Sequence, residues 1–167
     1  MNVLRNRSVP NVDFADPAAV LAALNLAFPM QRQNNMFFTL WYGVISTDSR
    51  ELSFACGGHP PAVVLNPAEA SPVMLRAPGA IIGGFPEARY AIGKHALTPG
   101  SRLYVFSDGV YELARSDGTT VQLEEFVAEL GKPAAASKLD EVMAWATAIR
   151  TGAGFEDDVS ILELIVP

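Results

Sequence analysis

Short runs rich in aromatic and β-branched residues fill the middle of the chain, and they constrain its fold more than any other feature. Pro, Gly, Asn and Asp residues typical of turns separate the runs, as they do between the strands of an antiparallel sheet. The predicted strands are 36–46, 50–57, 61–66, 71–76, 88–97 and 101–107. The polar segment 47–49 between the first two runs predicts a hairpin. We therefore expect the middle of the chain to be mostly sheet.

Helical patterns flank this sheet region on both sides. Asp16 followed by Pro17 is typical of a helix N-cap and first turn, and the apolar residues that follow fall on one stripe. These stripe residues are Val20, Leu21, Leu24 and Phe28. Further helices are predicted at 122–130 and 137–150, and a last strand at 158–166. This order predicts an α+β domain in which helices flank an antiparallel β-sandwich.

Composition narrows the classes of function. The 167 residues fit a single domain, and 50% of them are apolar, which suffices for a sizeable core. A net charge of −6 without a basic cluster argues against a nucleic-acid partner. No apolar run approaches the roughly 20 residues that cross a bilayer, so no membrane role is expected. A single cysteine, Cys56, excludes an intramolecular disulfide and favours a cytoplasmic location.

Carboxylates at strand ends are the first candidates for chemistry. Asp108 follows the apolar run 101–107 and precedes Gly109, while Asp157 and Asp158 come just before the last strand. Side by side, such residues would form an oxygen site suited to Mg²⁺ or Mn²⁺. From the residues alone, the alternative remains open that Asp-Gly makes a turn and that the later pair is solvated.

The segment from Gly57 to Pro61 combines two glycines, His59 and two prolines, which indicates a specialised loop. His59 and His95 lack the spacing of metal ligands, so neither is assigned to a metal. Ser107 lies outside any Gly-x-Ser-x-Gly motif, and Cys56 has no evident base nearby. Nucleophilic catalysis is therefore not expected.

Taken together, several segments resemble the SpoIIE-type branch of the PPM, or protein phosphatase 2C-like, family. The order and spacing of the segments also match, over residues from about 14 to 166. The segments are FFTLWYGV (37–44), ELSFACGGHPPAVVL (51–65), PGAIIGGF (78–85), LTPGSRLYVFSDGVYEL (97–113) and EDDVSILEL (156–164).

The resemblance implies a hydrolase in which two Mn²⁺ or Mg²⁺ ions activate a water that attacks a phosphoserine or phosphothreonine. Asp108 and Asp157 match two metal-binding Asp residues of the family, so both are the expected catalytic and metal residues, with Gly109 beside them at the metal. Asp158 is expected to matter less. Substrates in this branch are usually phosphorylated anti-sigma-factor antagonists, which implies a signalling regulator with an upstream sensor or receiver domain.

The sequence departs from the family at its start. The family begins with a Gly-Asp-Phe-Tyr-Asp-like motif whose first Asp bridges both metals, and then has an Asp-x-x-Gly-His-Gly segment; neither occurs here. Asp13-Phe14-Ala15-Asp16 imitates the first motif only superficially, because Asp16 is explained as a helix cap. We therefore expect residues 1–167 to be a single phosphatase domain truncated at its N-terminus. Alone it is expected to be inactive, because a dinuclear site without its bridging carboxylate holds at most one ion weakly.

Missing strands would also expose sheet edges and apolar surface, so we expect a homo-oligomer that meets near the N-terminal helix and the hairpin 37–57. Two alternative functions remain. One is a noncatalytic module that binds a phosphoprotein or another partner. The other is a small β-barrel binding domain, which would require His59 and His95 to converge.

Overall fold

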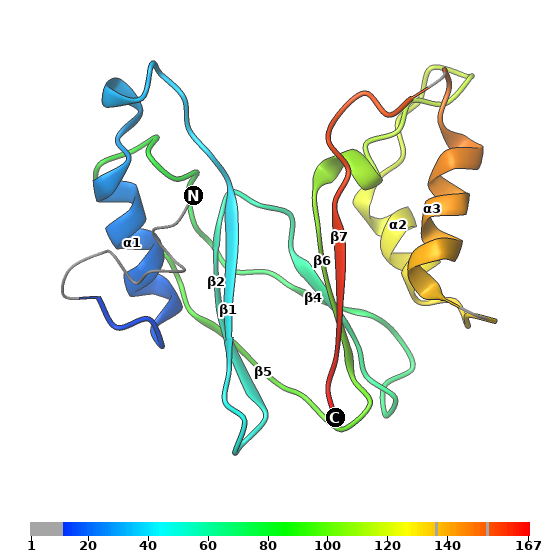
Figure 1. The fold of residues 1–167 in the computed structure, drawn as a ribbon, viewed down its shortest axis with the longest axis horizontal. Helices are drawn as coiled ribbons and strands as arrows, with labels where there is room; N and C mark the ends of the chain where they lie inside the picture. Colours follow the sequence, from blue (N-terminus) through cyan, green and yellow to red (C-terminus); the bar gives the residue numbers. More distant parts are fainter. Residues whose placement is uncertain (1–11, 136, 153) are drawn as a thin grey trace. The chain divides into compact units, whose positions relative to one another are not determined.

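The computed structural model of the chain describes residues 12–135, 137–152 and 154–167, which form two compact units (Figure 1). The first unit comprises residues 12–61 and 75–97, and the second comprises residues 62–74 and 98–167. The strand pairings whose register is resolved are antiparallel in both units. Helices and antiparallel sheets together confirm the predicted α+β class.

The first unit combines one α-helix with a three-stranded sheet of order β1-β2-β5. The expected hairpin is present, since β1 pairs with β2 in antiparallel register. Helix α1 packs on one face of this sheet (Figure 1). The elements are α1 (Pro17–Ala27), a 3₁₀ turn (Met30–Arg32), β1 (Leu40–Ile45), β2 (Glu51–Gly57) and β5 (Gly93–Ala96).

Helix α1 begins and packs as the sequence predicts. The Asp16 carboxylate accepts a hydrogen bond from the backbone N–H of Ala19 at 3.0 Å, which satisfies one of the free donors of the first turn. Val20, Leu21 and Leu24 are buried, and they form a core cluster with residues of the sheet such as Ala55. The predicted N-cap and apolar stripe are therefore confirmed.

A buried polar side chain ties a loop to this helix. Asn25 accepts a hydrogen bond from the N–H of Gly83 at 2.7 Å and donates one to the carbonyl of Phe85 at 2.9 Å. Gly83 has φ of +87°, and a Cβ there would lie 2.3 Å from the carbonyl oxygen of Phe28. The loop can approach α1 this closely only because position 83 is glycine.

The second unit places two helices on a four-stranded sheet of order β4-β3-β6-β7. Its sequence runs through two short strands, then β6, a 3₁₀ turn, both helices and the last strand. The elements are β3 (Ala62–Leu65), β4 (Val73–Leu75), β6 (Arg102–Phe106), a 3₁₀ turn (Asp108–Val110), α2 (Leu123–Leu130), α3 (Lys138–Ile149) and β7 (Ile161–Ile165).

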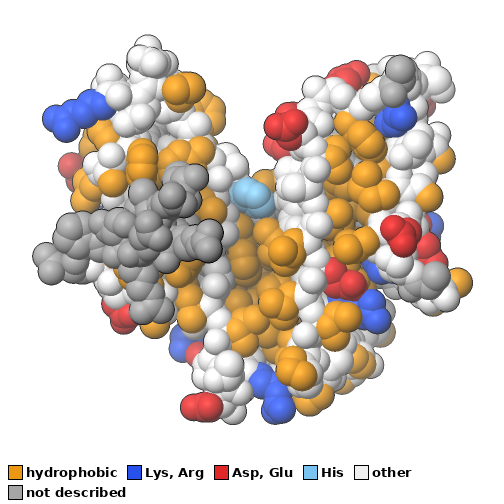
Figure 2. All heavy atoms as spheres, viewed as in Figure 1, with side chains coloured by type: hydrophobic (Ala, Val, Ile, Leu, Met, Phe, Trp, Pro, Cys, Tyr) orange, Lys and Arg blue, Asp and Glu red, His pale blue; other side chains and the backbone are white. Residues whose placement is uncertain are grey.

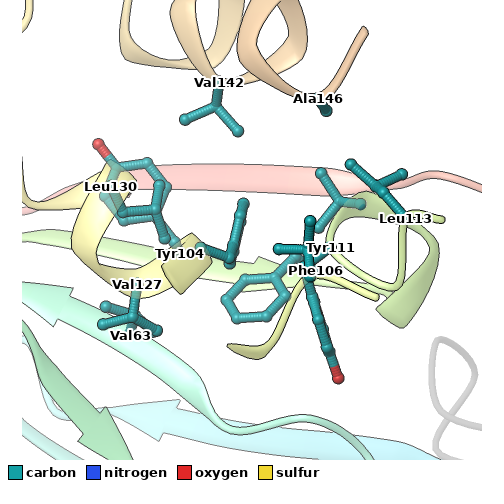
Figure 3. Close-up of a cluster of buried hydrophobic side chains, with 12 residues drawn as sticks. Val63, Tyr104, Phe106, Tyr111, Leu113, Val127, Leu130, Val142 and Ala146 are labelled. Carbon is teal, nitrogen blue, oxygen red and sulfur yellow. The ribbon is translucent and has the colours of Figure 1, made fainter. Parts of the chain in front are cut away.

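The core of the second unit lies between this sheet and the two helices (Figure 3). Tyr104 and Phe106 from β6 point to the same side as Val63 from β3, and Leu130 and Val142 close the cluster from α2 and α3. The ring of Phe126 on α2 meets that of Phe106 edge-on, with centroids 4.7 Å apart. Antiparallel strands presenting alternate side chains to the helices produce this arrangement.

A buried lysine connects the two helices. Lys138 is 4% exposed, and its Nζ donates to the carbonyls of Lys132 at 2.6 Å and Glu129 at 3.4 Å, where α2 ends. Glu141 lies 3.7 Å away as an ion-pair partner. A cation at this position satisfies carbonyl groups that a helix C-terminus leaves without partners.

Three predicted strand starts are wrong by three residues or more, including that of β1, which begins at Leu40 rather than at position 36. The strand expected over 88–97 is shortened to Gly93–Ala96, and Tyr90 makes only an isolated bridge to Gly79. The last strand begins at Ile161 rather than at position 158, because the residues before it bond to a side chain. Both helices of the second unit are confirmed to within a residue at each end.

Candidate metal centre

Asp108 lies where β6 ends and the chain turns into a 3₁₀ turn. Its carbonyl accepts the N–H groups of Tyr111 at 2.9 Å and Glu112 at 2.8 Å, so the backbone at this residue is fixed by the turn. Its half-buried carboxylate accepts the N–H of Gly109 through Oδ1 at 3.1 Å. The expectation of a carboxylate at a strand end followed by a turn is confirmed.

Ser107 fastens this strand end to the segment before β7. Its N–H donates to the carbonyl of Ser160 at 3.0 Å, and its hydroxyl donates to the carbonyl of Asp158 at 2.9 Å. The N–H of Ser160 donates back to the same hydroxyl at 2.9 Å. Ser107 therefore positions the neighbouring acidic segment, a role that its sequence context did not indicate.

Gly109 allows the acidic segment to approach still more closely. A Cβ at this position would lie 2.6 Å from the carbonyl oxygen of Asp158 and 3.2 Å from that of Asp157. The first distance is shorter than side chains tolerate, so the backbone of these residues packs against a bare glycine. The fold thus brings the segment around Asp157 beside the residue that follows Asp108.

Asp157 is exposed, and its Oδ1 accepts the N–H of Asp158 at 2.7 Å. Among the described residues, neither Asp157 nor Asp108 forms an ion pair, and neither Oδ2 has a protein hydrogen-bond donor. Each carboxylate thus has one oxygen oriented by its own backbone and a second oxygen available for a ligand.

These donors suit a hard divalent cation. Carboxylate oxygens and backbone carbonyls are the ligands that Mg²⁺ and Mn²⁺ prefer. The described residues contain no group of three or more His, Cys, Asp and Glu side chains arranged to hold a metal. The two carboxylates that the sequence nominates are those of Asp108 and Asp157, and two carboxylates can supply ligands for one ion completed by water.

The remaining sequence candidates lie in the first unit. His59 follows β2, where its carbonyl accepts the thiol of Cys56 at 2.9 Å and its Nδ1 lies 2.9 Å from the carbonyl of Pro60. Burial raises the pKa of the Cys56 thiol. His95 lies on β5 opposite Leu52. Along the described chain, no helix is long and apolar enough to cross a membrane.

Comparison with known proteins gives a family match over almost the whole chain. The family described as "Stage II sporulation protein E (SpoIIE)" matches residues 2–167. Among curated proteins, Protein IcfG of Synechocystis sp. is 36% identical over 81 residues, which cover 48% of this chain and 12% of that protein. Phosphoserine phosphatase RsbU of Bacillus subtilis is 28% identical over 102 residues, covering 61% of this chain and 30% of the relative. The chain thus matches less than a third of the length of either protein.

Among solved structures, the PP2C phosphatase domain of the cell fate determinant SpoIIE from Bacillus subtilis, determined with a fragment of its regulatory domain, has a similar fold. The TM-score is 0.77 at 16% sequence identity, and the alignment covers 99% of this chain and 48% of the other. At this identity the similarity concerns the fold, and it confirms the predicted fold class.

Proposed function

Because this chain belongs to the Stage II sporulation protein E (SpoIIE) family, we propose that it forms the metal-binding part of a phosphoserine and phosphothreonine protein phosphatase. In this proposal Asp108 and Asp157 are the catalytic metal ligands, with Gly109 beside them at the metal, and the ion is Mn²⁺ or Mg²⁺. The family is metal-dependent, and its relative RsbU carries the name of a phosphoserine phosphatase. The family match over residues 2–167 supports one phosphatase domain.

The observation that carries the proposal is the packing of the acidic segment against Gly109. Two strand ends 49 positions apart in the sequence meet there, and each supplies a carboxylate without a cationic partner among the described residues. Uncompensated charge at one edge costs free energy unless a cation offsets it. A structural role alone would not require both carboxylates.

Each residue of the site has a part in this chemistry. The 3₁₀ turn and the Gly109 N–H orient the Asp108 carboxylate, and the Asp158 N–H orients that of Asp157. Ser107 keeps the two segments together through its hydroxyl. A bound divalent ion in such a site lowers the pKa of a coordinated water and neutralises charge on phosphoryl oxygens. Two preoriented carboxylates reduce the reorganisation needed to hold it.

The family supports a proposal for the substrate class. We propose a phosphorylated protein resembling an anti-sigma-factor antagonist, and a cytoplasmic regulator in which a sensor or receiver domain controls the phosphatase. The chain itself shows no basic cluster in its sequence that would favour nucleic acid over protein. The matched parts of IcfG and RsbU are short, so the phosphoprotein and the sensor or receiver domain are proposed for this chain.

A second candidate is a module that binds the phosphoprotein without hydrolysing it. The observation in its favour is the donor set, because two carboxylates fit one ion and residues 1–167 carry no Gly-Asp-Phe-Tyr-Asp motif. This reading predicts that the chain binds a phosphoserine protein and never turns it over, with or without that motif.

Hydrolysis of a phosphoserine protein in Mn²⁺ tests the two candidates. We expect little turnover by the 167-residue chain and clear turnover when a family N-terminal segment carrying the motif is joined to it. In the joined protein, Asp108→Asn and Asp157→Asn should abolish most activity, and Asp158→Asn, the matched control, should reduce it less. A joined protein that binds metal but stays inactive supports the second candidate. Activity that is insensitive to Asp108→Asn would place the active site elsewhere.

A further inference from the structure

A cavity of about 250 Å³ lies within the second unit, where β6 begins. Its walls are the loop 66–72 between β3 and β4, the turn before β6, and the residue that ends α2. Arg102, the first residue of β6, lines the cavity, whereas Asp108 comes just after the other end of this strand. Six positions of extended chain correspond to about 20 Å. The cavity is therefore separate from the candidate metal centre.

A buried amide fixes the loop 66–72. Asn66 is 9% exposed, and its Oδ1 accepts the Ala68 N–H at 2.9 Å and the Thr98 hydroxyl at 2.8 Å. Its Nδ2 donates to Oε1 of Glu69 at 3.1 Å. These bonds join the loop to the turn before β6, and they also orient the Glu69 carboxylate. This wall of the cavity is therefore formed before any ligand binds.

The end of α2 closes the cavity from another side. A Cβ on Gly131 would lie 2.7 Å from Cγ of Pro72, which is closer than side chains tolerate, so the loop approaches the helix at a bare glycine. The resulting volume is smaller than the roughly 300–1,000 Å³ of sites for drug-sized ligands. The cavity therefore suits a ligand with few non-hydrogen atoms.

Two opposite charges line this cavity without pairing with each other. Arg102 donates to Glu163 through Nη1 at 2.9 Å and also contacts the Tyr104 hydroxyl. Figure 2 shows acidic and basic side chains next to each other beside β7, whose place is labelled in Figure 1. A guanidinium has five N–H donors, and the Arg102 side chain is 42% exposed, so donors remain for a further acceptor. The exposed Glu69 has no ion-pair partner within the described part of the chain.

The rest of the lining is mostly apolar, and Ser71 adds one hydroxyl. The apolar side chains are those of Leu65, Pro67, Ala70 and Pro72. A small ligand in this cavity thus meets one cationic wall, one anionic wall and an apolar surface.

We propose that the cavity binds a small zwitterion, of the chemical class of a free α-amino acid. The ligand's carboxylate accepts hydrogen bonds from the Arg102 guanidinium, and its ammonium group pairs with the Glu69 carboxylate. Its side chain lies against the apolar lining. A molecule that carries only one of the two charged groups uses only one of the two charged walls, so it binds more weakly.

NMR titration of the ¹⁵N-labelled 167-residue chain tests the proposal. The probes are single L-α-amino acids up to about 10 mM, each compared with the acid that lacks its amino group and the amine that lacks its carboxyl group. We expect at least one amino acid to shift the amide signals of loop 66–72 and Arg102, with a dissociation constant of about 1 mM or less. Both truncated compounds should bind about ten-fold or more weakly. If no amino acid moves these signals, or if a truncated compound binds equally well, the proposal fails.

Glu69→Gln removes the anionic wall and keeps the side-chain shape. It should weaken binding of the amino acid by about ten-fold or more and leave binding of the acid without an amino group unchanged, because Arg102 is retained. The matched control is Glu87→Gln, the same change at an exposed glutamate of the first unit, which should alter neither affinity. Amide spectra that match the parent outside the loop show that both variants are folded. An amino-acid affinity that is the same in Glu69→Gln and the parent would overturn the assignment.

Discussion

Substituting Gly109 by alanine is the sharpest structural perturbation of the candidate metal site. The new Cβ would lie 2.6 Å from the carbonyl oxygen of Asp158 and 3.1 Å from its carbonyl carbon, and both are backbone atoms that no rotamer change can move. Restoring ordinary contact requires a displacement of about 0.8 Å. The segment carrying Asp157 must therefore move away from Asp108.

The magnitude follows from what this displacement disturbs. Overpacking at a tight position costs about 1–3 kcal/mol, and weakening the hydrogen bond between Ser107 and Asp158 adds about 1 kcal/mol. We expect Gly109→Ala to lower the free energy of unfolding in urea by about 2–4 kcal/mol. Because the carboxylates separate, Mn²⁺ affinity measured in the folded state should fall as well, by about ten-fold or more.

Gly154→Ala is the matched control, since it lies in the same unit, its added Cβ meets nothing within 4 Å, and it makes the same chemical change. It should leave both stability and Mn²⁺ affinity unchanged within about 0.5 kcal/mol. If Gly109→Ala behaves like Gly154→Ala in both measurements, the acidic segment does not pack against Gly109 as the site requires, and the reasoning fails.

Three further predictions concern the rest of the fold. Lys138→Met should lower the free energy of unfolding by about 1–3 kcal/mol, because the buried carbonyls at the end of α2 lose their donor. The control Lys94→Met, at an exposed lysine, should change it by less than about 0.5 kcal/mol. Equal effects of the two substitutions in urea unfolding would contradict the capping role of Lys138. Asn25→Ala should cost about 2 kcal/mol or more by the same measurement, since two loop hydrogen bonds are lost; an unchanged midpoint would show that the loop needs no anchor. Burial raises the pKa of the Cys56 thiol, so less thiolate forms at pH 8 and alkylation by iodoacetamide should be about ten-fold or more slower in the folded chain than in urea; similar rates would disprove its burial.

Local features of the fold could be predicted from the sequence because they depend on neighbouring residues. The cap at Asp16 was predicted from its proline neighbour, and the hairpin between β1 and β2 from the polar turn between two β-rich runs. The turn at Asp117-Gly118 depends on neighbouring residues in the same way, with Gly118 at φ of +82° and the Thr119 N–H donating to the Asp117 carboxylate. Each of these signals acts within a few residues.

Features that depend on distant partners were not predictable in the same way. Strand β5 is shorter than its pattern indicated because only Gly93–Ala96 finds a partner in β2, and strand length depends on that partner. The sequence pattern indicates that Lys138 is a solvated residue in the first turn of α3, but the end of α2 packs over it and buries it. Its burial is set by packing between two helices, which no local pattern reports.

The same distinction between local and distant determinants applies to the residues of the candidate site. Asp108 and Asp157 were selected from strand ends and from the family resemblance, and their assignment as ligands stays a prediction. The contribution of Ser107 was missed, because its hydroxyl acts on a segment more than fifty positions away. Gly109 was assigned to the metal from its place beside Asp108, whereas the structure adds a steric reason for glycine there.

Calorimetric titration of the 167-residue chain with Mn²⁺ tests the central claim most directly. Two carboxylates with free oxygens should bind a single ion weakly, and Asp108→Asn or Asp157→Asn should each reduce the affinity by about ten-fold or more, because a charged oxygen ligand is lost while the side-chain shape is kept. Asp158→Asn should change it much less. A chain that binds no Mn²⁺, or one whose affinity is the same in Asp108→Asn, Asp157→Asn and the parent, would contradict the assignment of this metal site.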